Sequence, residues 1–418
     1  MMSCELLSPP FRSPRDQAFV AAPLPRRLLC FLGRVSVGIE FRLFVLLVLF
    51  MMSLTGFAFE SPLSMPAVQS IKAAKSPLTA ITRAGDRLVA VGQRGHILVS
   101  EDAGKSWSQA SVPVSSDLVA VSFASASHGW AVGHGGVVLK TEDGGLSWAV
   151  QLDGNQSSEL ILDYYAQRIG DERYPDASLL IEREKVLVGF GGTQALMDVY
   201  FENEQVGYVV GVFNRLLKTV NGGETWEPWV HRIDNPYELH FYSINAGKDG
   251  LYITGEQGMV WRLEEDNQQF VSVATPYDGT LFGSAIGSDE LVVFGMRGSV
   301  FLSMDRGQNW TRLEVDSVAG ITDGMIFDNG AIALVNLAGE LLISSDGGSS
   351  FTAQAIIEPM PFYGLAQISS SHLALVGAEG VQELAVVATD SSAGESSVSL
   401  FESGNVAMNR LELRHVTQ

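Results

Sequence analysis

Cysteine is almost absent from this sequence of 418 residues. The two cysteines, Cys4 and Cys30, both lie near the N-terminus, and none follows them. The rest of the chain therefore has no disulfide framework, no thiolate nucleophile and no cysteine metal site. Seven histidines are scattered without the spacing of metal ligands. We expect neither a metal site nor a cofactor.

Positive charge is also scarce, because 27 lysines and arginines stand against 47 acidic residues. Six of the basic and three of the acidic residues lie in the first 58, which leaves a net charge of −23 on the remainder. So acidic a surface repels phosphate backbones and keeps a protein soluble. We therefore expect no nucleic-acid partner.

The sequence holds one long apolar run, Leu43–Phe59, which follows Arg42. A basic flank, a short apolar core and the small residues Gly56 and Ala58 are typical of a secretory signal cleaved after Ala58. We interpret residues 1–58 as an N-terminal extension with a signal peptide, and expect an exported, periplasmic protein. A membrane anchor is the alternative, since 17 residues are at the short limit for spanning a bilayer.

Glycine, with 43 residues, is plentiful and marks an internal repeat. Each unit has a Gly-x-x-Gly-like turn, a short apolar run with alternating pattern, and an Asp/Gly turn closed by an aromatic residue. Seven units begin 40 to 44 residues apart, except for one interval of 78. Their first residues are Gly92, Gly133, Gly211, Gly255, Gly295, Asn336 and Gly377. This period predicts an all-β, seven-bladed propeller of four-stranded blades.

The second turn of the unit is an Asp-box, Ser/Thr-x-Asp-x-Gly-x-x-Trp/Phe. The Asp or Asn side chain accepts hydrogen bonds from the turn's own backbone, and the glycine takes a positive φ without steric cost. The aromatic residue is expected to pack between blades. The box residues to which we assign this structural role are Asp102, Trp107, Asp143, Trp148, Asn221, Trp226, Asp305, Trp310, Asp346 and Phe351.

The propeller is expected over residues 59–390, followed by a linker and C-terminal tail at 391–418. The seventh unit lacks a visible Asp-box, so its blade needs a strand from elsewhere to close the ring. Ala67–Ala73, ahead of the first blade, is our candidate for this fourth strand. Ser397–Val416 in the tail is the rival candidate.

The long interval contains an insertion at about 153–190, between the second and third blades. Ser158–Glu172 has apolar residues at three- and four-residue spacing and predicts a short amphipathic helix. A second piece, Ala177–Val188, is expected to continue it. Connections between blades and the turns between second and third strands open on one face of a propeller. The insertion should therefore share a face with the Gly-x-x-Gly turns, opposite the Asp-boxes.

Five of these turns carry a polar side chain that is a candidate for contact with a partner. They are Arg94, His134, Arg215, Gln257 and Arg297. Cations gathered on one face of an acidic protein favour an anionic partner at that face. The alternative is that they are ordinary solvated turn residues.

The Gly-x-x-Gly…(Ser/Thr)-x-Asp-Gly-Gly-x-x-Trp units across Pro77–Glu383 resemble the photosystem II stability/assembly factor family, a seven-bladed branch of the Asp-box propellers. The resemblance implies a lumenal or periplasmic assembly factor. Such a factor binds a membrane-protein subunit through a basic patch on one propeller face. In this sequence the patch maps only onto Arg94, Arg215 and Arg297.

An enzyme is the main alternative, because Asp-boxes also occur in sialidases and other glycoside hydrolases. The Arg-Ile-Pro motif of sialidases is absent here, and the sequence has seven units where sialidases have six. Glycosidases also need two carboxylates placed across a sugar, which sequence alone does not locate. We therefore expect a non-catalytic binding or scaffold protein, with a glycoside hydrolase or carbohydrate-binding propeller as the alternative.

Overall fold

The computed structural model describes residues 60–386, except 192–193 and 249. The expected signal peptide at 1–58, the tail at 391–418 and the rival closing segment Ser397–Val416 all lie outside this described part. Among the residues that are described, no helix has the length and apolar character needed to cross a membrane.

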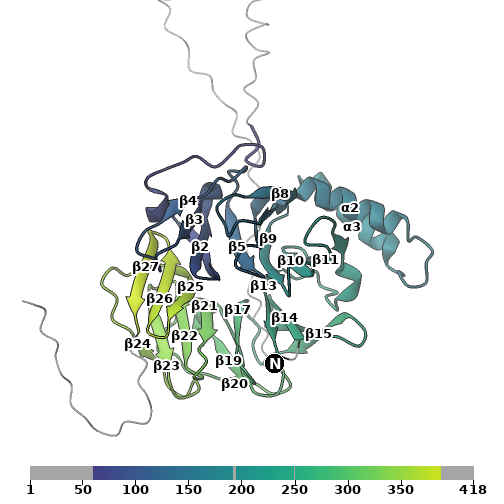
Figure 1. Cartoon of the computed structure of the whole chain (residues 1–418). Coiled ribbons are helices and arrows are strands. Elements are labelled where there is room, and N and C mark those ends of the chain that lie inside the picture. The colour runs from purple at the N-terminus through teal and green to yellow at the C-terminus, as the bar shows by residue number, and fades with distance from the viewer. Residues whose placement is uncertain (1–59, 192–193, 249, 387–418) are drawn as a thin grey trace, which may run out of the picture. The chain divides into compact units, whose positions relative to one another are not determined.

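Seven antiparallel sheets surround a central axis, and each is one blade of a propeller (Figure 1). Blade 1 consists of β1 (Leu78–Ala84), β2 (Arg87–Gly92), β3 (Ile97–Ser100) and β4 (Ser108–Gln109). Blade 2 consists of β5 (Leu118–Phe123), β6 (Gly129–Gly133), β7 (Val138–Thr141) and β8 (Ala149–Leu152). Blade 3 consists of β9 (Leu196–Phe201), β10 (Gly207–Gly211), β11 (Arg215–Thr219) and β12 (Glu227–Pro228).

The remaining blades follow the same order from the axis outward. Blade 4 consists of β13 (Phe241–Gly247), β14 (Gly250–Gly255), β15 (Met259–Glu264) and β16 (Gln269–Ala274). Blade 5 consists of β17 (Leu281–Ile286), β18 (Leu291–Gly295), β19 (Val300–Ser303) and β20 (Thr311–Arg312). Blade 6 consists of β21 (Ile321–Ile326), β22 (Ile332–Asn336), β23 (Leu341–Ser344) and β24 (Thr352–Ala353). Blade 7 consists of β25 (Phe362–Ser369), β26 (His372–Gly377) and β27 (Gly380–Ala385). The predicted seven-bladed propeller is confirmed.

The second strand of each blade is buried on both faces, because neighbouring blades cover it from either side. All five residues of β6 are buried, as are all five of β10, β18 and β22. The apolar core therefore lies between blades and repeats around the ring. At one such junction the rings of Trp130 and Phe201 stack with their centroids 3.4 Å apart.

The ring is closed by direct packing of blade 7 against blade 1. Leu78 and Ile81 of β1 share a buried cluster with Ala366 of β25 and Val376 of β26. The expectation that Ala67–Ala73 supplies a fourth strand to blade 7 is wrong. That segment follows the outer edge of blade 1, where the Ala67 N–H donates to the Val112 carbonyl at 3.0 Å. Blade 7 has three strands among the residues that the structure describes.

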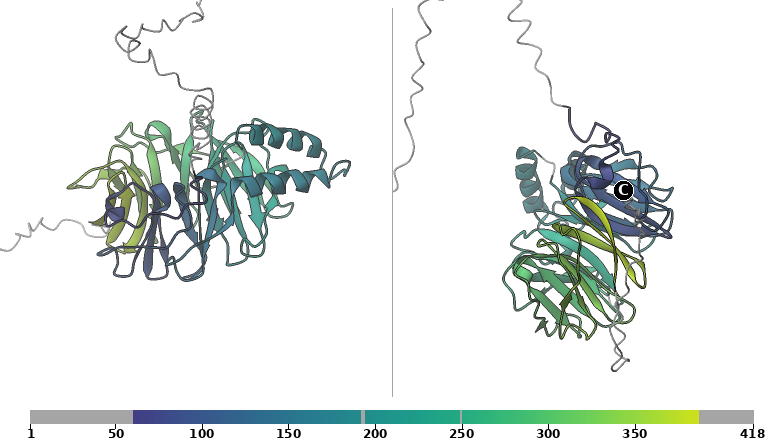
Figure 2. Two further views of the ribbon diagram at one scale, coloured as in Figure 1. Left: turned by 90° about the horizontal axis from the view of Figure 1, so that it is seen from above. Right: turned by 90° about the vertical axis from the view of Figure 1, so that its left-hand side faces the viewer.

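The insertion forms two helices, α2 (Gly154–Ala166) and α3 (Ala177–Gly189). They extend beyond the rim of the ring (Figure 2). The first helix begins four residues earlier than predicted, because Asp153 and Gln156 form a capping box at its N-terminus. It also ends earlier than Glu172, and α3 is a separate helix that packs against it. The sequence pattern extended the helix through a turn in which Gly170 has a φ of +84°.

Candidate partner-binding face

The turns between the second and third strands present their polar residues at the tips of left-handed bends. Arg94, Gln257 and Arg297 have φ values of 58°, 55° and 59° and are exposed. The glycine after each has no room for a side chain. A Cβ on Gly95 would lie 2.1 Å from the Val114 carbonyl oxygen, for example. The turn therefore requires glycine at its fourth position and projects the third residue outward.

His134 is the second residue of the equivalent turn in blade 2, residues 133–136, and is exposed, whereas Gly135 takes the left-handed third position with a φ of 74°. A Cβ on Gly136 of this turn would lie 2.7 Å from the Cα of Gly154, the first residue of α2. The turn and the insertion are thus in contact on one face of the propeller, as the order of the strands predicts.

Arg215 lies elsewhere, and this corrects its sequence-based assignment to an exposed set of arginines. Its side chain is 5% exposed and forms a bidentate ion pair with Glu184 of α3, at 3.0 and 3.1 Å. Gln194 accepts a third hydrogen bond from the same guanidinium at 3.0 Å. A guanidinium with its donors occupied in the interior is not available to a partner. Arg215 instead attaches the insertion to blade 3.

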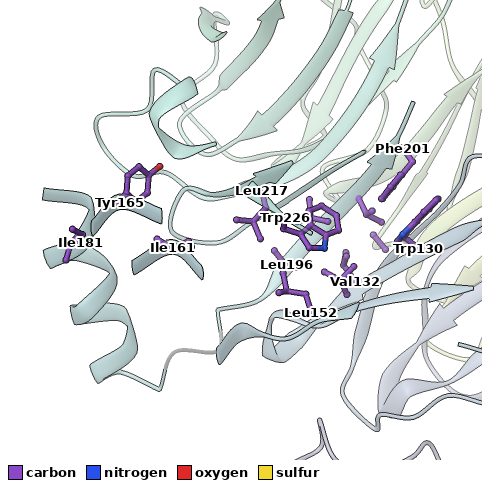
Figure 3. Close-up of a cluster of buried hydrophobic side chains, with 14 of the residues drawn as sticks. Trp130, Val132, Leu152, Ile161, Tyr165, Ile181, Leu196, Phe201, Leu217 and Trp226 are labelled. Carbon is purple, nitrogen blue, oxygen red and sulfur yellow. The ribbon is translucent and has the colours of Figure 1, made fainter. Parts of the chain in front are cut away.

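Aromatic residues make the second attachment of the insertion. The Tyr164 hydroxyl donates to the carboxylate of Glu227 in β12, and the Tyr165 hydroxyl lies 3.0 Å from Nδ1 of His231. Burial raises the pKa of Tyr165 and lowers that of His231 to about 4, so both groups are neutral at pH 7. Figure 3 shows Tyr165 beside Ile181, and both belong to the cluster that continues into blades 2 and 3.

The Asp-boxes use their polar groups within their own turns. In the first box, the Asp102 carboxylate accepts the N–H of Ser106 at 2.8 Å, and the Gly104 N–H donates to Ser100 Oγ at 2.8 Å. Asn221 reproduces the first of these bonds with its amide oxygen at 3.0 Å. Hydrogen bonds from Ser106 hold the pKa of Asp102 down at about 2. Box carboxylates are therefore ionised and already engaged, which does not favour a glycosidase role.

The box aromatics lie at the junctions between blades. Trp148 and Trp226 are buried, whereas Trp107, Trp310 and Phe351 are half-buried. Trp148 joins a cluster with Val99 of blade 1, and its ring meets that of Phe123 edge-on at 6.1 Å. The indole N–H donates to the Gly145 carbonyl at 2.9 Å. Each box thus couples a local turn to the packing of the ring.

The axis of the ring is a channel of about 520 Å³ that contains two carboxylates, Asp198 and Asp323. Asp198 accepts the N–H of Val199 and, from the next blade, the N–H of Ile244, both at 2.8 Å. Asp323 accepts the N–H of Leu365 of blade 7 at 3.0 Å. Burial raises the pKa of Asp198 to about 7 and that of Asp323 to about 6. The bonds to Ile244 and Leu365 join neighbouring blades, so both carboxylates have a structural role.

One histidine lies beside a serine and a carboxylate without forming a catalytic relay. Ser127 Oγ and Glu204 Oε1 both approach the same nitrogen of His128, Nδ1, at 3.0 and 3.1 Å. A relay places the nucleophile and the carboxylate on different ring nitrogens. Within residues 60–386, as far as they are described, no three His, Cys, Asp or Glu side chains gather to hold a metal ion.

The comparison with known proteins assigns a family to this propeller. The model of the family described as "Photosynthesis system II assembly factor YCF48" matches residues 99–170 and 182–351, more than half of the chain. The protein belongs to the YCF48 family. The two matched segments end and resume within the insertion, which places residues 171–181 outside the match.

Two curated relatives whose names describe photosystem II assembly factors share short segments with this chain. "Photosystem II stability/assembly factor HCF136, chloroplastic" of Oryza sativa subsp. japonica is 24% identical over 34% of this chain and 35% of its own. "Photosystem II assembly lipoprotein Ycf48" of Synechococcus sp. (strain CC9902) is 25% identical over 37% of this chain and 47% of its own. The chain thus matches about a third to a half of the length of these relatives.

Solved structures of the same family share the fold. The structure titled "YCF48 bound to D1 peptide" has a TM-score of 0.55 at 18% identity, and covers 78% of this chain and 100% of its own. "YCF48 from Cyanidioschyzon merolae" has a TM-score of 0.55 at 14% identity over 77% and 98% of the two chains. At these identities the likeness concerns the propeller fold alone.

Sequence reasoning about this YCF48-family face missed Glu184, Glu227 and His231. These three residues hold the insertion in place, yet none lies in a repeat unit's motif. Glu184 carried one usable signal. It is a carboxylate in the middle of a helical apolar pattern, and such residues are seldom buried without a partner.

Proposed function

We propose that this YCF48-family protein is an exported, non-catalytic assembly or stability factor that binds a membrane-protein subunit on the periplasmic or lumenal side. The face that carries the turn tips and the insertion is the proposed contact surface. The observation that supports it is the exposure of Arg94, Gln257 and Arg297 at left-handed turn positions, and of His134 in a turn that contacts the insertion. Relatives named photosystem II assembly factors, one of them a lipoprotein, support the role.

The proposed binding mode is the docking of a polypeptide of the subunit, as in the relative whose title names a bound D1 peptide. Arg94 and Arg297 would contribute attraction that weakens with added salt, because both are exposed. No observation favours the glycoside hydrolase alternative, since the box carboxylates are engaged in their own turns.

The test is recovery of an integral membrane subunit from detergent-solubilised membranes of the host, using the tagged protein. We expect Arg94→Glu/Arg297→Glu to lose the subunit while the melting temperature stays unchanged, because both side chains are exposed. Lys105→Glu/Arg312→Glu makes the same charge change at exposed positions in an Asp-box and an outer strand, and should retain the subunit. Equal recovery with both double variants would move the contact surface away from the turn tips.

A further inference from the structure

A groove of about 560 Å³ lies between α3 and the connection from β12 to β13. Its size is in the range of sites that bind ligands or short peptide segments. One wall is the helix, with Leu179 and Leu180, and the other is formed by Ile233 and by Val271 of β16. Leu179 is 66% exposed, so the groove offers apolar surface that the fold itself does not cover.

The charges in the groove are predominantly negative. Its charged lining residues are Asp176, Asp234, Glu238 and Arg183. Arg183 lies 2.9 Å from the Glu238 carboxylate, so these two charges compensate one another. The negative charges of Asp176 and Asp234, which are both exposed, are therefore left in the groove. The His231 side chain in the same wall is neutral. Two carboxylates beside apolar walls complement a cation that is carried next to an apolar side chain.

The outer strand of blade 4 adds a feature that favours a polypeptide. β16 has six residues, whereas β4, β12, β20 and β24 have two each. On its outer side the Phe270 carbonyl accepts the Asp234 N–H at 3.1 Å. Because outward-facing residues alternate along a strand, Ser272 and Ala274 present their backbone groups on the same side. Within the described chain these groups have no backbone partner, and an extended peptide can pair with them.

The walls of the groove are held rigidly before any partner arrives. Glu184 on α3 is paired with Arg215 in the interior, and Tyr165 on α2 bonds to His231 at 3.0 Å. A site that is already ordered loses less conformational entropy on binding than one that must first form.

We propose that this groove binds an extended polypeptide segment in which leucine-like side chains alternate with lysine or arginine. The apolar side chains lie against Leu179 and Ile233, and the cations pair with Asp176 and Asp234. The inference rests on the proposed binding function and specifies the chemistry of the segment at this groove, whose lining does not include the turn residues Arg94 and Arg297. It also assigns the insertion a role in recognition that the repeat units do not supply.

The experiment measures fluorescence anisotropy of two short labelled peptides in about 0.15 M salt, where weak surface attraction is screened. One peptide alternates leucine with lysine, and the other has glutamate in place of each lysine. We expect the basic peptide to bind the full protein. Asp176→Lys/Asp234→Lys should weaken it by roughly tenfold or more and strengthen binding of the acidic peptide.

The matched control is Glu159→Lys/Asp163→Lys, which makes the same charge change at exposed positions of α2 that do not line the groove. It should bind the basic peptide as the parent does, and Leu179→Ser should weaken that binding. Absence of binding by the parent, or equal weakening by the control and groove variants, would overturn the proposal.

The two proposals fail separately. Arg94→Glu/Arg297→Glu leaves the groove intact and should bind the basic peptide unchanged. If the peptide test fails while the membrane subunit is still recovered, the groove is wrong and the proposed function stands. If the peptide binds as expected but no membrane subunit is recovered, the groove proposal stands and the proposed function is wrong.

Discussion

The Asp-box turns and the helical insertion are stabilised over very different distances along the chain. In the box at Asp143, the carboxylate bonds to the residue four positions later, at 2.9 Å. In the insertion, Glu184 bonds to a residue 31 positions away, and Tyr165 to one 66 positions away. A box turn is therefore specified by its own few residues. The two helices keep their position only because the ring supplies partners for them.

The largest expected effect on stability tests whether an Asp-box contributes only within its own turn or also through the packing of its aromatic residue between blades. Trp148→Ala should lower the free energy of unfolding by about 4 kcal/mol, because a buried indole between two blades leaves a cavity. Chemical denaturation monitored by circular dichroism measures it. Trp107→Ala, at a half-buried equivalent position, should cost clearly less. Equal costs would show that burial between blades does not set the contribution of the box aromatic.

The next effect tests the attachment of the insertion. Glu184→Ala should lower the free energy of unfolding by about 3 kcal/mol, since Arg215 then remains charged in the interior without its partner. The double variant Glu184→Leu/Arg215→Met should lie close to the parent, because both charges are removed together. The prediction fails if the double variant loses as much stability as the single one.

A smaller effect is expected from the hydrogen bonds of one box. Asp143→Ala removes bonds to the N–H and hydroxyl of Ser147, at 2.9 and 2.6 Å, and should cost about 1 kcal/mol. Asp143→Asn keeps the acceptor for the N–H and should recover part of that loss. A loss for Asp143→Ala as large as that for Glu184→Ala would contradict the distinction between local and long-range support.

The smallest expected effect is a change in how the melting temperature depends on pH. Hydrogen bonds from Ser106 and Ser350 hold the pKa of Asp102 and Asp346 down at about 2. A lowered pKa contributes stability above the unfolded-state value of about 4 that is lost as the pH falls towards 2. Asp102→Asn/Asp346→Asn should therefore show a shallower fall in melting temperature across that interval. Asn221 is the natural precedent for this substitution, and a slope identical to the parent's would refute the expectation.

The sequence by itself determined the number of blades, the positions of the Asp-boxes and the turns that carry Arg94, His134, Gln257 and Arg297. It did so because each of these features depends on residues a few positions apart, in which a glycine permits a positive φ or a carboxylate reaches its own backbone. Because the turn and Asp-box motifs recur along the chain, they can be recognised in the sequence.

Only the tertiary structure decided the partner of Arg215, the course of Ala67–Ala73 and the shape of the insertion. Arg215 is the fifth residue of its unit, which corresponds to the buried His96 and not to the exposed third residues Arg94 and Arg297. Its guanidinium has partners there because α3 folds back and brings Glu184 within 3.0 Å of it. Ala67–Ala73 follows blade 1 and is not a strand of blade 7, because the Ala67 N–H bonds to the carbonyl of Val112, which blade 1 brings to it from a distant part of the sequence. Contacts between distant segments have no local pattern, and so the groove beside α3 was decided by the fold.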